Sequence, residues 1–213
     1  MANKPIRVLV VDDSAYIRKV VREMLERSPD IQVIGSARNG LEALELVEQL
    51  NPDVVTLDLI MPELDGVGFL RAQMPKQRIP VVVCSIASET GETAIQAIEA
   101  GALEFVQKPT ALAIEQVYEI TNNLIAKVKA AASVTPDKIP VPESIVPGER
   151  IPPRAAKGTV DAVLIGISTG GPQALRYMIP KFPKNFPVPL AIVLHMPVGY
   201  TGPFAAKLND ASA

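Results

Sequence analysis

The sequence predicts an α/β protein: a flavodoxin-like, doubly wound parallel sheet of five strands, followed by the start of a second α/β domain. Two observations carry this prediction. Short apolar runs of strand length alternate with stretches whose apolar residues recur at helical spacing. A proline-rich stretch then separates this region from another strand, turn and helix pattern near the end of the chain.

Each expected strand is a short run of β-branched and aliphatic residues, which is typical of strands buried on both faces of a parallel sheet. The third run, Val54-Val55-Thr56-Leu57, ends abruptly at Asp58. Met61-Pro62 and Asp65-Gly66 then indicate a loop. In chain order, the expected strands are residues 6–11, 31–34, 53–58, 80–85 and 103–106.

The stretches between these strands have the periodicity of amphipathic helices. Ser14 is the expected N-cap of the first helix, in which Val21 and Met24 fall on the inner face. In the second helix we expect four residues to face inward: Leu41, Leu44, Val47 and Leu50. The expected helices are residues 15–27, 39–50, 68–73, 89–100 and 112–131.

Composition excludes several classes of function. The chain has 213 residues and a formal net charge of −2, which gives no electrostatic reason to bind nucleic acid or an anionic membrane. No apolar run reaches the roughly 20 residues that a membrane span needs, and the N-terminus lacks a signal-peptide core. The single cysteine, Cys84, cannot form an internal disulfide. We therefore expect a cytoplasmic protein without nucleic-acid binding or membrane insertion.

Polar residues stand at the carboxyl ends of four expected strands. Asp12 and Asp13 follow the first strand, Asp58 ends the third, Ser85 the fourth, and Lys108 follows the fifth. In an open parallel sheet these ends meet at one edge, outside which ligands bind. A lone aspartate after a strand is more commonly a cap or turn residue. The combination of three acids, a hydroxyl and a lysine at one edge favours a site.

The three acids predict a metal-assisted site. Carboxylates a few ångströms apart repel one another by about 4 kcal/mol per pair at an effective dielectric of 20, and a hard cation such as Mg²⁺ relieves this repulsion. Carboxylates also serve as nucleophiles in aspartyl-phosphate chemistry. We therefore assign Asp58 as phosphoryl acceptor, Asp13 as direct metal ligand and Asp12 as a ligand through water. Lys108 and the Ser85 hydroxyl are expected to contact phosphoryl oxygens.

Residues 4 to about 131 resemble a response-regulator receiver domain. The resemblance is carried by Val-Val-Asp-Asp-Ser, Leu-Asp-Leu-Ile-Met-Pro-Glu-Leu-Asp-Gly, Cys-Ser and Gln-Lys-Pro. It implies the strand order 2-1-3-4-5, phosphotransfer from a histidine kinase, and a metal contact from the Ile60 main-chain carbonyl. It also implies a cis peptide before Pro109. Phe105 matches the family's switch aromatic, although a plain core residue explains it as well.

Prolines divide the chain into regions. Six prolines between residues 132 and 158 exclude regular helix and central strand there, so we expect a linker. It is either a passive spacer or a segment that docks the receiver over a second site. The expected apolar anchors of such a segment are Ile139, Val141, Ile145, Val146 and Ile151. The expected regions are a receiver domain at 1–131, a linker at 132–158 and part of an esterase domain at 159–213.

The second region contains a candidate serine nucleophile. The strand Val160–Ile165 leads into Gly166-Ile-Ser168-Thr-Gly170, a nucleophile-elbow pattern ahead of a helix from Gln173 to Ile179. A phosphate-binding glycine loop would have a similar sequence. His195 follows the next strand, residues 188–194, where it can act as general base for Ser168. The serine and histidine together favour acyl transfer.

The stretches Ile-Gly-Ile-Ser-Thr-Gly-Gly-Pro and His-Met-Pro-Val-Gly-Tyr-Thr-Gly-Pro-Phe-Ala-Ala-Lys-Leu-Asn resemble the catalytic domain of the CheB family of chemotaxis methylesterases. This implies hydrolysis of glutamate methyl esters on methylated chemoreceptors, sometimes deamidation of receptor glutamines, and phosphorylation by the chemotaxis histidine kinase. The family's catalytic aspartate has no match, since neither Asp161 nor Asp210 is at its position. We expect a truncated copy with two strands and one full helix in the esterase part. The alternative is a catalytically inactive, phosphorylatable binding switch.

Overall fold

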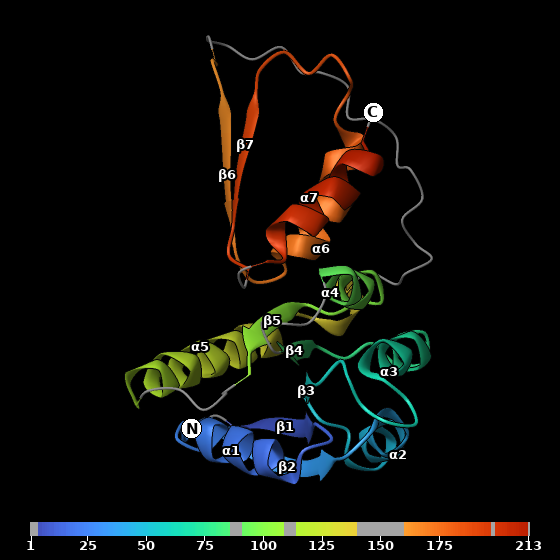
Figure 1. The fold of residues 1–213 in the computed structure, drawn as a ribbon, viewed down its shortest axis with the longest axis vertical. Helices are drawn as coiled ribbons and strands as arrows, with labels where there is room; N and C mark the ends of the chain where they lie inside the picture. Colours follow the sequence, from blue (N-terminus) through green and yellow to red (C-terminus); the bar gives the residue numbers. More distant parts are fainter. Residues whose placement is uncertain (1–3, 86–90, 109–113, 140–159, 197–198, 213) are drawn as a thin grey trace.

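A computed structural model describes the chain except for residues 1–3, 86–90, 109–113, 140–159, 197–198 and 213. At Ser85, residues 114–116 and Lys138 only the backbone is described. The chain forms two units, a five-stranded α/β unit and a smaller one that lies against it (Figure 1).

The larger unit is built on a parallel sheet with the strand order β2-β1-β3-β4-β5. This is the predicted flavodoxin-like order. The central strand β3 is buried along its whole length, as its aliphatic sequence predicts. The strands are β1 (Ile6–Val11), β2 (Ile31–Ala37), β3 (Val54–Leu57), β4 (Val81–Ser85) and β5 (Glu104–Gln107).

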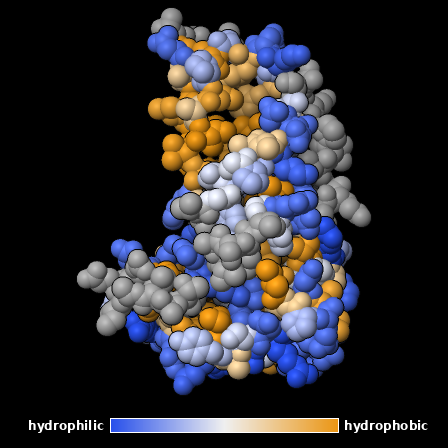
Figure 2. Space-filling view, in the orientation of Figure 1, coloured by the Kyte–Doolittle hydropathy of each residue, from blue (hydrophilic) through white to orange (hydrophobic). Residues whose placement is uncertain are grey.

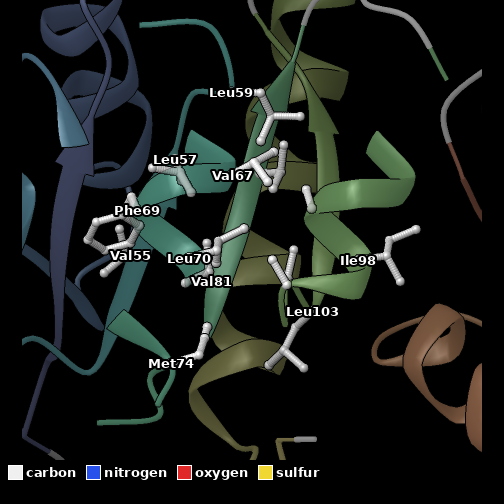
Figure 3. Close-up of a cluster of buried hydrophobic side chains, with 14 of the residues drawn as sticks. Val55, Leu57, Leu59, Val67, Phe69, Leu70, Met74, Val81, Ile98 and Leu103 are labelled. Atoms are coloured by element: carbon white, nitrogen blue, oxygen red, sulfur yellow. The ribbon is translucent and has the colours of Figure 1, made fainter. Parts of the chain in front are cut away.

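Helices cover both faces of the sheet and enclose two apolar clusters. On one face, α2, α3 and α4 pack over Leu57, Val81 and their neighbours, with Phe69 and Leu70 fully buried (Figure 3). On the other face, α1 and α5 contribute Leu25, Leu124 and Val128 to the second cluster. The helices are α1 (Ala15–Leu25), α2 (Gly40–Leu50), α3 (Gly66–Gln73), α4 (Gly91–Glu99) and α5 (Ile114–Ala132), followed by the 3₁₀ turn η1 (Pro136–Lys138).

Local hydrogen bonds fix where the helices begin. The side chains of Ser14, Asn39 and Asp65 each accept a hydrogen bond from the third backbone N–H beyond them, which makes them N-caps. Ser14 therefore caps α1 as predicted. One prediction for α2 is wrong: Leu41 is 48% exposed, because at 3.6 residues per turn it lies on the other side of the helix from Ala43 and Val47, which form the inner face.

The smaller unit has a two-stranded parallel sheet of β6 (Val163–Ile167) and β7 (Leu190–Leu194). Two helices accompany it, α6 (Gly171–Met178) and α7 (Thr201–Asp210), with the 3₁₀ turn η3 (Ile179–Lys181) between the first helix and β7. Only one full helix was predicted here. The second helix, α7, contains Gly202 and Pro203, which are typical of loops, although a proline is tolerated in the first turn of a helix.

The small sheet leaves an apolar face uncovered by described residues. Leu164 is 80% exposed and Val193 73% exposed on these two paired strands. Figure 2 shows a hydrophobic area over the smaller unit. At the opposite end, the smaller unit is closely packed against the larger one. Leu175, Tyr200 and Phe204 are buried in the same cluster as the core of the five-stranded unit, and the linker residue Ile139 is fully buried there.

Candidate functional site

A buried lysine and two buried aspartates meet at the carboxyl edge of the five-stranded sheet. Lys108 follows β5, and its Nζ lies 2.6 Å from Asp58 Oδ2, after β3, and 3.0 Å from Asp12 Oδ2, after β1. All three residues are less than a tenth exposed. These residues were predicted to lie at one edge of the sheet, and the structure brings them into direct contact.

Backbone groups orient the second oxygen of each carboxylate. Ile60 N donates to Asp58 Oδ1 at 3.2 Å, and Ser14 N donates to Asp12 Oδ1 at 2.9 Å. The loop beneath Asp58 is tightly packed, since a Cβ at Gly66 would lie only 2.2 Å from the Asp58 carbonyl oxygen. Only glycine fits there. Asp65 caps α3, and Gly66 lets this helix begin in close contact with the backbone of Asp58.

Arg18 belongs to this corner and was not among the predicted site residues. Its Nη1 donates to the main-chain oxygens of Asp12, at 2.8 Å, and Asp13, at 3.0 Å. Side chains in a helix lean toward its N-terminus, so an arginine in the first turn after a functional loop reaches back over that loop. This signal was present in the spacing of Arg18 from the two aspartates.

The acidic residues form a group that suits a divalent cation. One carboxylate oxygen from each of Asp12, Asp13 and Asp58 lies within 4.8 Å of the others, and Asp13 is exposed to solvent. Oxygen-only ligands of this kind favour a hard ion such as Mg²⁺. The donor set therefore fits the predicted metal, with Asp13 as the residue that is open to approach.

Burial perturbs the titration of the central pair. Desolvation raises the pKa of Asp58 above its ordinary value of 3.8, and although the hydrogen bond and charge of Lys108 oppose this shift, the nearby Asp12 charge adds to it. Burial alone would lower the pKa of Lys108, but the carboxylates of Asp58 and Asp12 raise it above 10.5 overall. Lys108 is therefore a permanent cation at neutral pH.

The other predicted residues of this corner are placed as follows. Ile60 is 59% exposed beside Asp58, so its surroundings are open to solvent. Ser85 ends β4 and pairs with Gln107 of β5, and its side chain is outside the described residues. Pro109 is also outside them. Phe105 is buried, with its ring centroid 6.0 Å from that of Tyr200 in the smaller unit.

The predicted serine and histidine also come together. Ser168 follows β6 and His195 follows β7, and a backbone hydrogen bond from His195 N to Ile167 O joins the two strand ends. Ser168 Oγ lies 3.5 Å from His195 Nδ1, and both residues are exposed. Among the described residues no carboxylate hydrogen-bonds to His195, and Asp161 and Asp210 do not take that place. The pair can transfer a proton from the hydroxyl to the imidazole.

The contact between the units lies next to this pair and was not foreseen. Gly170 of the Ser168 loop donates its N–H to Glu104 of β5 at 3.1 Å. Gln173 and Arg176 of α6 donate to main-chain oxygens at the end of α4. No sequence signal marked these residues, because their partners lie about 70 residues away in the chain.

Two family models match the chain. The response regulator receiver domain matches residues 8–119, and the CheB methylesterase family matches residues 163–213. The two matched segments correspond to the two units of the structure. Within the part of the chain that the structure describes, no helix is both long and apolar enough to cross a membrane.

Individual proteins with similar sequences and structures agree with these matches. A protein-glutamate methylesterase/protein-glutamine glutaminase of Myxococcus xanthus is 50% identical over 210 residues, which are 96% of this chain and 59% of that protein. The Bacillus subtilis protein of that name is 41% identical over 97% of this chain and 60% of its own length. The response regulator domain of Thermotoga maritima CheB is 38% identical, with a TM-score of 0.57, over 62% of this chain and all of that domain. The chain thus spans about three fifths of the length of these full-length relatives.

Proposed function

Because the chain belongs to the response regulator receiver family and also contains part of a CheB methylesterase domain, we propose that it is a phosphorylation-regulated chemotaxis response regulator. In this proposal the receiver is phosphorylated on Asp58 and controls an esterase that acts on glutamate methyl esters of chemoreceptors. The contact of Lys108 Nζ with Asp58 and Asp12 supports it best, since it places a cation where a transferred phosphoryl group would carry its charge.

Phosphoryl transfer needs a nucleophile and a cation in contact. A carboxylate oxygen of Asp58 attacks the phosphorus atom of the donor, which we propose is a phosphohistidine of the chemotaxis histidine kinase. The phosphorus–nitrogen bond breaks as the phosphorus–oxygen bond forms, and the product is an acyl phosphate. Lys108 then exchanges its contact with Asp58 Oδ2 for one with a phosphoryl oxygen, and the Ser85 hydroxyl donates to another.

We propose that Mg²⁺ is held by Asp13, Asp58 and the Ile60 main-chain carbonyl, with Asp12 contributing through water. When bound, the ion neutralises charge on both the carboxylate and the phosphoryl group. The cluster of carboxylate oxygens in this corner supports the proposal. Arg18 donates to the main-chain oxygens of Asp12 and Asp13 and so helps to fix the loop that carries both carboxylates.

For the esterase part, Ser168 Oγ attacks the γ-carbonyl carbon of a methylated glutamate while His195 Nδ1 accepts the hydroxyl proton. The imidazolium then gives this proton to the departing methoxide, so methanol leaves and an acyl-enzyme remains. Water hydrolyses the acyl-enzyme, with the histidine again acting as base. Deamidation of a glutamine would follow the same steps with ammonia as the leaving group.

The receiver assignment is tested by labelling the chain with acetyl phosphate in the presence of Mg²⁺. We expect labelling of the wild type, and its loss in Asp58→Asn and on chelation of the metal. Asp13→Asn should raise the Mg²⁺ concentration that half-maximal labelling requires, because it removes a metal ligand. The surface variant Glu23→Gln should leave this concentration unchanged. Labelling that persists in Asp58→Asn would refute the assignment of the acceptor.

A second function has one observation in its favour. The Ser168–His195 pair stands at 3.5 Å without a carboxylate partner for the histidine among the described residues, which suits a chain that acts only as a phosphorylatable binding switch. Hydrolysis of a methyl-ester substrate by this chain and by Ser168→Ala separates the two functions. Serine-dependent turnover supports the esterase, and equal, background rates support the binding switch.

A further inference from the structure

Two of the three carboxylates in the acidic corner are fixed by contacts of both their oxygens. The oxygens of Asp12 contact Ser14 N at 2.9 Å and Lys108 Nζ at 3.0 Å. Those of Asp58 contact Ile60 N at 3.2 Å and the same lysine at 2.6 Å. Both aspartates are almost fully buried. The protein therefore holds these two side chains in place from two sides.

Asp13, the third acid, is anchored only through its backbone. It is exposed, and among the described residues its only hydrogen bond is the one that its main-chain oxygen accepts from Arg18 Nη1, at 3.0 Å. The same nitrogen donates to Asp12 O at 2.8 Å, so one guanidinium group bridges two successive peptide carbonyls. The orientation of the Asp13 peptide, and with it the direction in which its side chain leaves the backbone, depends on this contact.

The position of Arg18 in α1 favours contact with the loop over an ion pair. It lies in the first turn of the helix, where side chains lean back toward the N-terminus. Ion pairs in α1 join Lys19 to Glu23 and Arg22 to Glu26, and among the described residues Arg18 forms none. The half-buried guanidinium group is therefore directed at the carbonyl oxygens of the loop.

From this arrangement we propose that Arg18 is a positioning residue for the divalent cation: it holds the Asp13 peptide so that the exposed carboxylate is directed toward those of Asp12 and Asp58. The inference rests on the proposed function, in which these acids bind Mg²⁺. Residues that orient a metal ligand typically change metal affinity by about 10- to 100-fold when they are removed. Arg18 acts in this way through a peptide group and not through the carboxylate itself.

The sign of the effect separates positioning from simple electrostatics. A guanidinium group close to the site repels a divalent cation. If Arg18 acted through its charge alone, its removal would therefore strengthen the binding of Mg²⁺. If Arg18 orients Asp13, its removal weakens the binding. The two roles predict opposite changes in the dissociation constant of Mg²⁺.

The test is a titration of the full chain with Mg²⁺ alone, in which NMR chemical shifts of amides in the acidic corner report the dissociation constant. Arg18→Met removes the charge and the donors but keeps an unbranched side chain, and should raise this constant about tenfold. Arg18→Lys keeps a charged donor and should stay within about twofold of the wild type. Lys19→Met removes a charge at the next position, where the side chain is 74% exposed, and should not raise the constant.

A double-mutant cycle identifies the ligand on which the arginine acts. In an Asp13→Asn background, Arg18→Met should change the dissociation constant by less than about twofold, because the carboxylate that Arg18 positions is gone. An unchanged or lower dissociation constant in Arg18→Met would overturn the inference and leave the proposed function standing, and so would an equal loss of affinity in the Asp13→Asn background. A wild-type chain that binds no Mg²⁺ would refute the proposed metal site, and the inference with it.

Discussion

The ring of Phe105 in the receiver lies 6.0 Å from the ring of Tyr200 in the smaller unit, centroid to centroid, with the two planes tilted by 58°. Both residues are almost fully buried. Tyr200 belongs to the loop after His195, as Gly170 belongs to the loop after Ser168. Consecutive residues of β5, Glu104 and Phe105, therefore contact the two loops that carry the candidate catalytic pair.

We predict that these two rings stabilise the contact between the units. A double-mutant cycle of Phe105→Leu and Tyr200→Leu should give a coupling free energy of about 0.5–1.5 kcal/mol, the range for aromatic pairs in tilted contact. Urea unfolding followed by circular dichroism measures it. The matched cycle of Phe105→Leu with Tyr177→Leu should give no coupling, because Tyr177 is 55% exposed on α6. Strictly additive effects of the first pair would contradict the contact.

A second prediction concerns the backbone beneath the acceptor. Gly66→Ala would place a Cβ 2.2 Å from the Asp58 carbonyl oxygen and 2.8 Å from Leu59 Cα, and neither backbone group can move without displacing Asp58. We expect a loss of about 1–3 kcal/mol in the free energy of unfolding, together with weaker Mg²⁺ binding.

The comparison for this change is Gly68→Ala in the same helix. Its Cβ would lie 2.6 Å from Leu64 Cδ1, the end of a partly exposed side chain that can turn away. Chemical unfolding and magnesium titration of the two variants should therefore differ. Equal effects in both would show that Asp58 is not held by this close approach.

The fold was predictable because its signals are local. Aliphatic runs such as Val54–Leu57 form buried parallel strands, and N-caps such as Ser14 fix helix starts. The acidic corner was predictable for a geometric reason, since parallel strands bring Asp12, Asp58 and Lys108 to one edge. The metal-binding and phosphoryl roles of these residues stay predictions, as do the region boundaries at residues 131 and 158.

What the sequence did not reveal depends on tertiary contact. Glu104 is the first residue of β5, and nothing in the local sequence indicates that Lys127 and Gly170 contact it. The exposure of Leu41 depends on which side of α2 faces the sheet, and a four-residue apolar pattern cannot fix that angle to better than one position. For the linker, the buried Ile139 agrees with a docking segment, and the remaining anchors lie outside the described residues.

The third prediction is a pH dependence of the metal-free protein. Because the pKa of Asp58 is raised in the folded state above 3.8, the folded chain binds this proton more tightly than the unfolded chain does. The contribution of Asp58 to the free energy of unfolding therefore falls as pH rises from about 3.8 through the folded-state pKa. In the presence of a chelator, Asp58→Asn should gain stability relative to the wild type across this window. Thermal melts from acid to neutral pH measure the difference, and a constant difference would contradict the raised pKa.

The last prediction follows from the face of the β6–β7 sheet that no described residue covers. Leu164 and Val193 are 80% and 73% exposed on neighbouring strands, and a contiguous apolar face of this kind promotes association in water. We expect the chain to self-associate with increasing concentration, and Leu164→Lys with Val193→Lys to abolish the effect. Since both side chains contact mainly solvent, the double variant should keep its free energy of unfolding within about 0.5 kcal/mol per site. Sedimentation velocity over a range of protein concentrations measures the association. Leu164→Ile is the control, because it keeps the apolar face. Association that persists in the double lysine variant would show that another surface mediates it.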